Sequence, residues 1–400
     1  MKEEDGISGR MQLYVSAKNV SALTQYWRRQ NVDLNFSFQD WNQHESVYRH
    51  FRHLSPRALI NSATFRRLLF PDLFVVGLTS TFVMAFNEDY ILPRVDPQDA
   101  YVAGNLIELH DMMITLPAIP FTLSSFALGL LVTFRTQSGH ARYVQARKDW
   151  GAIINVTRDL GSRIVNRVSC EKKRGFGIKL VQSFPYTLMA HLTEDGSEGL
   201  KLKLDHTLSN EDVEEAKNKA LRKLLEEEVW KDTDEHGRAY LDTLFEPSIK
   251  NKPLHVLNEL RRMNVVSSAE ELTLAGSSPS HTTVADPIIS SGLDGRILDL
   301  MNALGSCERI LRTPIYTSYT RHASRFLTLW CNALPMALYP VVGPEMTVPF
   351  SLAIAFIMLG IEDIGIRVEQ PFNILPLWQY SGVVKASCDQ ILEQRERSSA

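Results

Sequence analysis

The segment Met112–Phe134 and the arginines behind it are the residues best suited to act on an ion. The segment has no charged residue, and Pro117 and Pro120 lie near its start. Prolines there leave peptide N–H groups at a helix end, and their partial positive charge attracts anions. Arg135 and Arg142 follow the segment, and we expect them to attract anions near a pore. The pattern therefore favours anions over cations.

Patterns for other chemistries are missing from the sequence. The eleven histidines form no His-x-x-x-His or His-Glu-x-x-His pair, so no metal site is predicted. Neither a glycine-rich phosphate loop nor a Gly-x-Ser-x-Gly motif is present, so we do not expect an enzyme. The net charge of −3 at pH 7 gives no indication of nucleic-acid binding. The four cysteines form no Cys-x-x-Cys pair and are predicted to be free thiols.

Four apolar runs are candidates for the helices that would position such an ion path. A spanning helix needs roughly 20 mostly apolar residues, and Met112–Phe134 fits this best. The other three candidates are Leu68–Phe86, Phe326–Gly343 and Met346–Ile361. The last run is short, but it closely follows the third, which predicts a helical hairpin returning through the bilayer. A soluble protein with four buried helices is the alternative.

The charges around these runs predict an orientation. The segment between the first two runs is acidic, whereas arginines flank the runs on the other side. The positive-inside rule then places both termini and the long segment 135–325 on the inside. Helical periodicity continues over 141–170, 209–230, 252–264 and from Leu293 to Arg312.

The sequence therefore predicts an all-α membrane protein in five parts. The segment 265–292 is rich in Ser, Thr, Gly and Pro, so we expect a flexible insertion without a packed core. The parts are an N-terminal inside segment 1–66, membrane helices 1 and 2 in 67–134, a helical inside domain 135–325 that contains the insertion, membrane helices 3 and 4 in 326–366, and a C-terminal tail 367–400.

Three stretches resemble the bestrophin family of anion channels. They are PFTLSSFALGLLVTFRTQSGHARYVQARKDWGAIINVTRDL, CERILRTPIYTSYTRHASRFLTLW and LGIEDIGIRVEQPFNILPL. The motifs RTPI, TRHASRF, GIEDIG and PFNILPL are most similar to the chloroplast branch, the voltage-dependent chloride channels of the thylakoid. The resemblance covers most of residues 55–385, apart from the segment 265–292.

This resemblance implies a homopentamer with four membrane helices per subunit around one central pore. It implies a pore neck on the second membrane helix, at Ile119, Leu123 and Ala127. These positions are four residues apart, so they share one helix face. Animal members mostly carry a bulky residue at the third position, so Ala127 suggests a wider neck. By the same resemblance, Pro253 suggests an inner aperture at Leu254.

The sequence departs from the calcium-gated members of that family. Those members follow a Pro-Phe pair with a cluster of acidic residues that binds calcium. Here Pro371 and Phe372 are followed by NILPLWQY, which has no carboxylate, and calcium prefers several hard oxygen ligands. We expect no calcium clasp and no cofactor, with chloride as the permeant ion. Glu362 and Asp363 are interpreted as a charged cap that pairs with arginines, with a gating role as the alternative.

The function that the resemblance implies is passive conduction of chloride or other small anions. The channel would balance charge across the thylakoid membrane, with voltage dependence and with both termini on the stromal side. Its partners would be further copies of itself, the lipid bilayer and the anion, and no nucleic acid. A bicarbonate-conducting channel and a non-conducting membrane scaffold are the alternatives.

Overall fold

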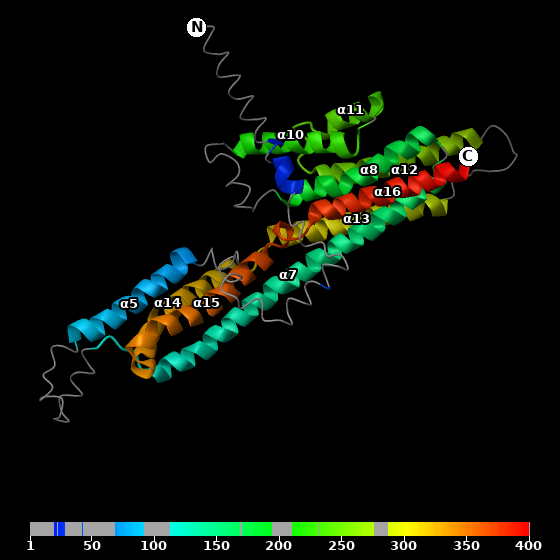
Figure 1. Cartoon of the computed structure of the whole chain (residues 1–400). Coiled ribbons are helices and arrows are strands. Elements are labelled where there is room, and N and C mark those ends of the chain that lie inside the picture. The colour runs from blue at the N-terminus through cyan, green and yellow to red at the C-terminus, as the bar shows by residue number, and fades with distance from the viewer. Residues whose placement is uncertain are drawn as a thin grey trace, which may run out of the picture. The chain divides into compact units, whose positions relative to one another are not determined.

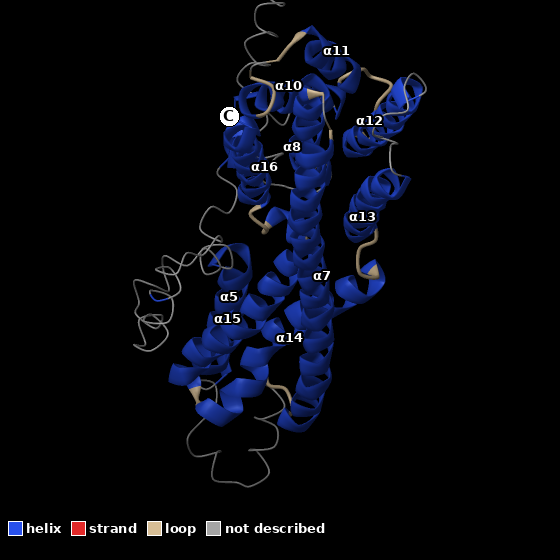
Figure 2. Ribbon diagram, turned by 90° about the vertical axis from the view of Figure 1, so that its right-hand side faces the viewer, coloured by secondary structure: helices blue, strands red, loops and turns tan. Residues whose placement is uncertain are grey.

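The computed structural model describes residues 20–21, 23–28, 42, 69–91, 113–168, 170–193, 210–231, 233–275 and 287–399. Within these ranges the chain is helical without any strand (Figure 2), which confirms the predicted all-α class. Most of the predicted N-terminal segment 1–66 lies outside them. Two compact units are formed: unit 1 is Met1–Asn35, Val144–Thr313 and Gln370–Ala400, and unit 2 is Phe36–Tyr143 and Pro314–Glu369.

Unit 2 contains the predicted membrane helices. α5, α14 and α15 pack against one another and lie side by side in Figure 1. The elements are η3 (Leu69–Leu73), α5 (Phe74–Ala85), η4 (Phe86–Ile91), the first part of α7 (Ala118–Arg167), α14 (Thr317–Val342) and α15 (Pro344–Glu369). They share one apolar core, formed by Leu73, Val76, Leu128, Val132, Leu327, Cys331, Ala355 and Leu359.

The outer faces of these helices also carry many bulky apolar side chains. Bulky side chains such as Phe74, Phe82, Phe126 and Ile357 are more than half exposed in a single chain. Only 17% of the most apolar window of α7 is buried. A water-soluble bundle does not expose so large an apolar surface, so these faces meet lipid, a neighbouring subunit or a pore.

Three of the described helices are long and apolar enough to cross a membrane. They are Phe70–Asp89, Ala118–Arg167 and Pro344–Glu369. The predicted third span, Phe326–Gly343, forms most of α14, but α14 is not among the three. Asn332 and two prolines lower the mean hydropathy of α14. Length and composition therefore support three of the four predicted spans.

The predicted hairpin between the last two runs is confirmed as two packed helices. α14 ends at Val342 and α15 begins at Pro344. Gly343 joins them with φ of 79°, a left-handed conformation that costs glycine little. Pro344 then starts α15, where a missing N–H breaks no helical hydrogen bond.

Unit 1 is built around one buried helix, α8. α8 packs against α10, α12, α13 and α16, and its residues from Gly177 to Leu192 are almost all buried. A helix that is buried on all sides is the core of its unit. The bounds are α8 Glu171–Leu192, α10 Asn210–Glu228, α11 Glu235–Leu244, α12 Lys252–Ala275, α13 Pro287–Arg312, η7 Pro371–Asn373 and α16 Leu377–Ser399.

The predicted insertion 265–292 is shorter than expected. α12 continues to Ala275, and α13 already begins at Pro287. The stretch SSAEELTLA contains Ala, Glu and Leu, which are strong helix formers, and this explains the extension of α12. The residues between the two helices lie outside the described part. All four cysteines lie within it and are free thiols, as predicted.

Candidate functional site

The first part of α7 has two different faces within unit 2. Leu128 and Val132 are buried in the shared core. The face with the predicted neck positions is exposed: Ile119 is 74% exposed, Leu123 is 70% exposed, and Ala127 is exposed as well. Sequence spacing thus placed these three on one uncharged face, which no other described part of the chain covers.

The two prolines mark the beginning of α7. The helix begins at Ala118, one residue after Pro117, and Pro120 lies in its first turn. The first N–H groups of a helix have no partner within it, so proline there costs no hydrogen bond. No acidic residue lies in this first turn. The helix end therefore keeps its partial positive charge, as the sequence predicted.

A proline in α14 explains how the start of α7 is held. The N–H of Leu116 donates to the carbonyl of Met336 in α14, at 3.0 Å. In a regular helix that carbonyl accepts from the residue four positions later, which here is Pro340 and has no N–H. Pro340 thus leaves the Met336 carbonyl available. The Ile114 N–H, just before, donates to the Asn87 side chain at 2.9 Å.

The hydroxyl groups of this segment are satisfied inside the helix. Thr122 donates to the carbonyl of Ala118, Ser124 to Phe121, and Ser125 to Thr122, at 2.6–2.8 Å. Such side chains can lie in an apolar environment because their donors are used within the helix. The two serines in the middle of the span therefore need no polar partner outside it.

Arg135 lies at the end of the apolar part of α7, but it does not face an open path. Its side chain is 6% exposed and forms an ion pair with Glu362 of α15. It also donates to the Ser324 hydroxyl at 2.7 Å, and that hydroxyl donates to Glu362 at 2.5 Å. Its charge is compensated within unit 2, and the expectation that Arg135 attracts anions stays a prediction.

The interpretation of Glu362 and Asp363 as an arginine-pairing cap is confirmed. Glu362 pairs with Arg135, and Asp363 pairs with Arg367 at 3.2 Å. Local sequence did not reveal the first pair, because its partners are 227 positions apart. The sequence did contain a signal for this pair, because Arg135 and Glu362 each lie at the edge of an apolar run. Arg142 is half-buried and donates to the Glu369 carbonyl at 3.1 Å, so its predicted effect on anions stays a prediction.

α7 and α15 approach closely at one glycine. A Cβ added at Gly139 would lie 3.2 Å from the carbonyl oxygen of Gly365. Arg142 contacts the same helix one turn later. At the other end, Phe121 stacks on Trp330 of α14 with ring centroids 4.5 Å apart. The exposed face of α7 is therefore supported along its length by contacts on its other side.

Comparison with known proteins identifies the family of this chain. A family model described as Bacterial/Fungal Bestrophin protein matches residues 41–390. The chain belongs to the bestrophin family. This bestrophin is 24% identical over 371 residues to voltage-dependent chloride channel 2, chloroplastic, of Arabidopsis thaliana, and the match covers 90% of this chain and 73% of the plant protein. The predicted resemblance is thereby confirmed.

Two further comparisons extend this result. A voltage-dependent anion channel-forming protein of Synechocystis is 28% identical over 285 residues, covering 70% of this bestrophin and 79% of that protein. The crystal structure of a bacterial bestrophin homolog from Klebsiella pneumoniae matches with a TM-score of 0.56 and 19% identity. That match covers 81% of this chain and 98% of the other, and it shows the shared fold.

The predicted inner aperture of this bestrophin lies in unit 1. Leu254 is in the first turn of α12 and is 37% exposed. Asn251 caps that helix, because its side-chain oxygen accepts the Leu254 N–H at 3.1 Å. Pro253, beside it, is buried. A rigid helix start thus holds Leu254, and its role as an aperture remains a prediction.

The segment where calcium-gated bestrophins bind their ion is a short turn here. Pro371–Asn373 form the 3-10 helix η7, and α16 follows from Leu377. In the described part of the chain, no three His, Cys, Asp or Glu side chains form a group that could hold a metal ion.

Proposed function

We propose that this bestrophin is an anion channel that conducts chloride passively along α7. The uncharged, exposed face with Ile119, Leu123 and Ala127 is the observation that carries the proposal. It is apolar, continuous and positioned by contacts on the opposite face of the same helix. The family, and relatives named as voltage-dependent chloride or anion channels, support the same function.

The pore requires several copies of the chain around one axis. We propose a homopentamer, in line with the family resemblance, in which five α7 helices contribute the neck. A neck of apolar side chains conducts ions only where it is wide enough to stay hydrated. Ala127 has a small side chain at the third neck position, which favours a wide, conducting neck over a closed one.

Anion preference would come from the start of α7 rather than from Arg135. Five helix ends, whose first N–H groups have no partner within the helix and whose first turns contain no carboxylate, would form a ring of partial positive charge. Arg142 would add to it on the inner side. Bicarbonate fits the same chemistry, so a bicarbonate-conducting channel is a variant of this proposal.

The first experiment measures current through purified protein in planar bilayers under a KCl gradient. We expect a reversal potential near the chloride equilibrium value. We expect Ala127→Phe to reduce the current severalfold, because a ring of five phenyl groups narrows and dehydrates the neck. Ala353→Phe is the matched control, since Ala353 is exposed on α15 and not on α7, and it should conduct like the wild type.

Two outcomes would contradict the proposal. No current from protein that native mass spectrometry shows to be pentameric favours a non-conducting scaffold. A current that Ala127→Phe leaves unchanged keeps a channel but moves its neck away from α7. Replacing chloride by bicarbonate in the same bilayers gives the relative permeability of the two anions.

We also propose a thylakoid location with both termini on the stromal side. The chloroplastic name of the plant relative and the asymmetry of loop charge support it. Protease treatment of sealed thylakoids should remove a C-terminal tag from the stromal side. A tag that is protected until the membrane is opened would reverse the orientation.

A further inference from the structure

The arginines in the described part of unit 2 fall into two groups. Arg135, Arg142 and Arg367 each contact a carboxylate or a backbone carbonyl of the same unit. Arg321 and Arg325, both in α14, form neither an ion pair nor a side-chain hydrogen bond with any residue that the structure describes. The chain leaves these two charges available to a ligand.

Arg321 and Arg325 share one face of α14. They are four residues apart, so their side chains lie one above the other, and both are exposed. The opposite face packs inside unit 2. Leu327 is buried there, and the Tyr319 hydroxyl donates to the Leu131 carbonyl of α7 at 2.8 Å. The packing of α14 therefore turns the two arginines away from the core of the unit.

The same face becomes apolar directly after the arginines. Leu329 lies one turn beyond Arg325 and is 69% exposed. Thr328 is exposed as well, but its hydroxyl donates to the Ser324 carbonyl at 3.0 Å, so it needs no partner in an apolar environment. The sequence has no carboxylate from residue 309 to residue 344. A positive patch thus borders an apolar surface on one helix face.

Tyr316 indicates where this patch lies relative to the membrane. It directly precedes α14 and is 75% exposed. Tyrosine is enriched where lipid headgroups meet water. Arg321 and Arg325 lie between Tyr316 and the predicted span Phe326–Gly343, which corresponds to the depth of the headgroups. The loop charges assign this end of α14 to the inner side.

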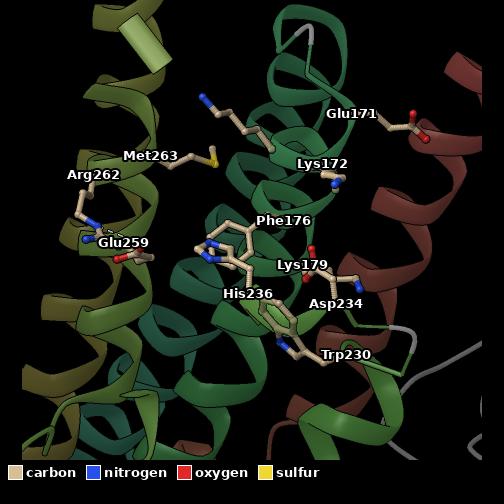
Figure 3. A pocket seen from close by; sticks show the side chains of 12 residues that line it. Glu171, Lys172, Phe176, Lys179, Trp230, Asp234, His236, Glu259, Arg262 and Met263 are labelled. Carbon is tan, nitrogen blue, oxygen red and sulfur yellow. Dashed lines mark hydrogen bonds and ion pairs between the residues drawn. The ribbon is translucent and has the colours of Figure 1, made fainter. Parts of the chain in front are cut away.

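A cavity in unit 1 provides a contrast. It has a volume of about 780 Å³ and lies between α8, the start of α11 and α12 (Figure 3). Lysines line it, but the carboxylates of Glu171, Asp234 and Glu259 share the lining. Its charge therefore selects no ligand. Arg321 and Arg325 have no carboxylate within ion-pair distance among the described residues.

We propose that Arg321 and Arg325 bind the headgroup of an anionic phospholipid, whose acyl chain lies along Leu329. A guanidinium is planar and donates parallel N–H groups, which suits the oxygens of a phosphate. The adjoining apolar surface favours a lipid over a soluble anion. The proposal rests on the membrane location of the family and not on the conducted anion, because its test measures binding instead of current.

The test uses the full chain in a neutral detergent and phosphatidylglycerol as the probe. Native mass spectrometry counts the lipids bound per chain during a titration. We expect one phosphatidylglycerol per chain to bind about 25-fold more tightly than phosphatidylcholine with the same acyl chains. Each arginine near an anionic lipid contributes roughly a factor of five to this difference. Equal affinity for the two lipids overturns the proposal.

The double substitution Arg321→Gln and Arg325→Gln should weaken phosphatidylglycerol by the same factor and leave phosphatidylcholine unchanged. Arg238→Gln with Lys250→Gln is the matched control, because it removes the same charge from exposed positions of unit 1. The control should bind like the wild type. Arg321→Lys with Arg325→Lys keeps the charge and should retain most of the affinity. Equal affinity of the first variant and the control contradicts the proposal.

Other occupants of this face of α14 give different results. Glycerol phosphate presents a phosphate without acyl chains, and its displacing phosphatidylglycerol at similar concentrations would show a site for a soluble anion. Dissociation of the Gln variant into smaller oligomers, seen in the same spectra, would show that the arginines contact another copy of the chain. Either result contradicts the proposal. Without phosphatidylglycerol, the Gln variant should melt at the wild-type temperature, because neither arginine has a partner among the described residues.

Discussion

Arg135 lies at the edge of the apolar part of α7, where its charge is already paired within the chain. It follows an apolar run, as an anion-attracting residue would, but its guanidinium is buried between Glu362 and Ser324. A buried ion pair seldom adds much stability, because removing both charges from water is costly. Removing only one partner is different, since the other charge is then left uncompensated. The group therefore fixes where α7, α14 and α15 meet.

Glu362→Gln should destabilise unit 2 by about 3–5 kcal/mol, because it leaves the buried Arg135 charge without a counterion. Scanning fluorimetry of the detergent-solubilised protein would show a lower melting temperature. Asp363→Asn is the control: Asp363 pairs with a partly exposed arginine, so the change should be small. The double variant Arg135→Met with Glu362→Met should be more stable than either single variant. An additive double variant would show that the two charges are not coupled.

At the scale of elements, two prolines decide how α7 begins. Pro120 lies in the first turn, where a missing N–H costs no helical hydrogen bond. Pro340 has no N–H to occupy the Met336 carbonyl, which accepts the Leu116 N–H. The hydrogen bond links the residues just before α7 to α14, which is far away in the sequence. The bond can form because Pro340 has no N–H that would bind the Met336 carbonyl within α14. This is an unusual role for a proline inside a helix.

Pro340→Ala should weaken that link. The new backbone N–H at position 340 would compete for the Met336 carbonyl, so the Leu116 amide should exchange with solvent up to about tenfold faster. Hydrogen–deuterium exchange of a peptide that covers residue 116 measures this. Pro335→Ala in the same helix concerns a different carbonyl and should leave the exchange at Leu116 unchanged. Equal effects of both variants would contradict the assignment.

Two glycines of α7 test the packing of that helix on α15. Gly139→Leu should destabilise the fold by about 1–3 kcal/mol, since an added Cβ would lie 3.2 Å from the Gly365 carbonyl and the packing is already tight. Gly129→Leu adds its Cβ where no atom lies within 4 Å, so it should be neutral or slightly stabilising. Melting temperatures of the two variants measure the difference. Two equally stable variants would mean that α7 and α15 do not approach closely.

Elements were predictable from the sequence to different degrees. Apolar composition located α7 and the α14–α15 hairpin, because long uncharged runs have few other uses. The helical conformation of the segment SSAEELTLA was not predicted, because its serines were given more weight than its helix-forming Ala, Glu and Leu residues. The Arg135–Glu362 pair was missed because no local pattern joins residues 227 positions apart. The cavity lined by Phe176, His236 and Met263 was not predicted for the same reason, because its lining comes from the separate helices α8, α11 and α12.

At the scale of the whole molecule, we expect conduction that does not depend on calcium. Calcium needs six to eight oxygen ligands, whereas Glu362 and Asp363 are engaged with arginines, and no carboxylate directly follows Pro371. Currents in planar bilayers should be equal with added calcium chloride and with excess EGTA. A calcium-gated animal bestrophin in the same setup is the positive control. A current that disappears in EGTA would contradict the expectation.

The long separation of the Arg135 partners also sets an order of events during synthesis. Ser324 is made 189 residues after Arg135 and Glu362 is made 227 residues after it. At about 5–20 residues per second, the second interval lasts roughly 10–45 s. Throughout that time the nascent chain carries a positive charge at the edge of a finished apolar helix without its counterion. Unit 2 can complete its fold only after its last helix, α15, has left the ribosome.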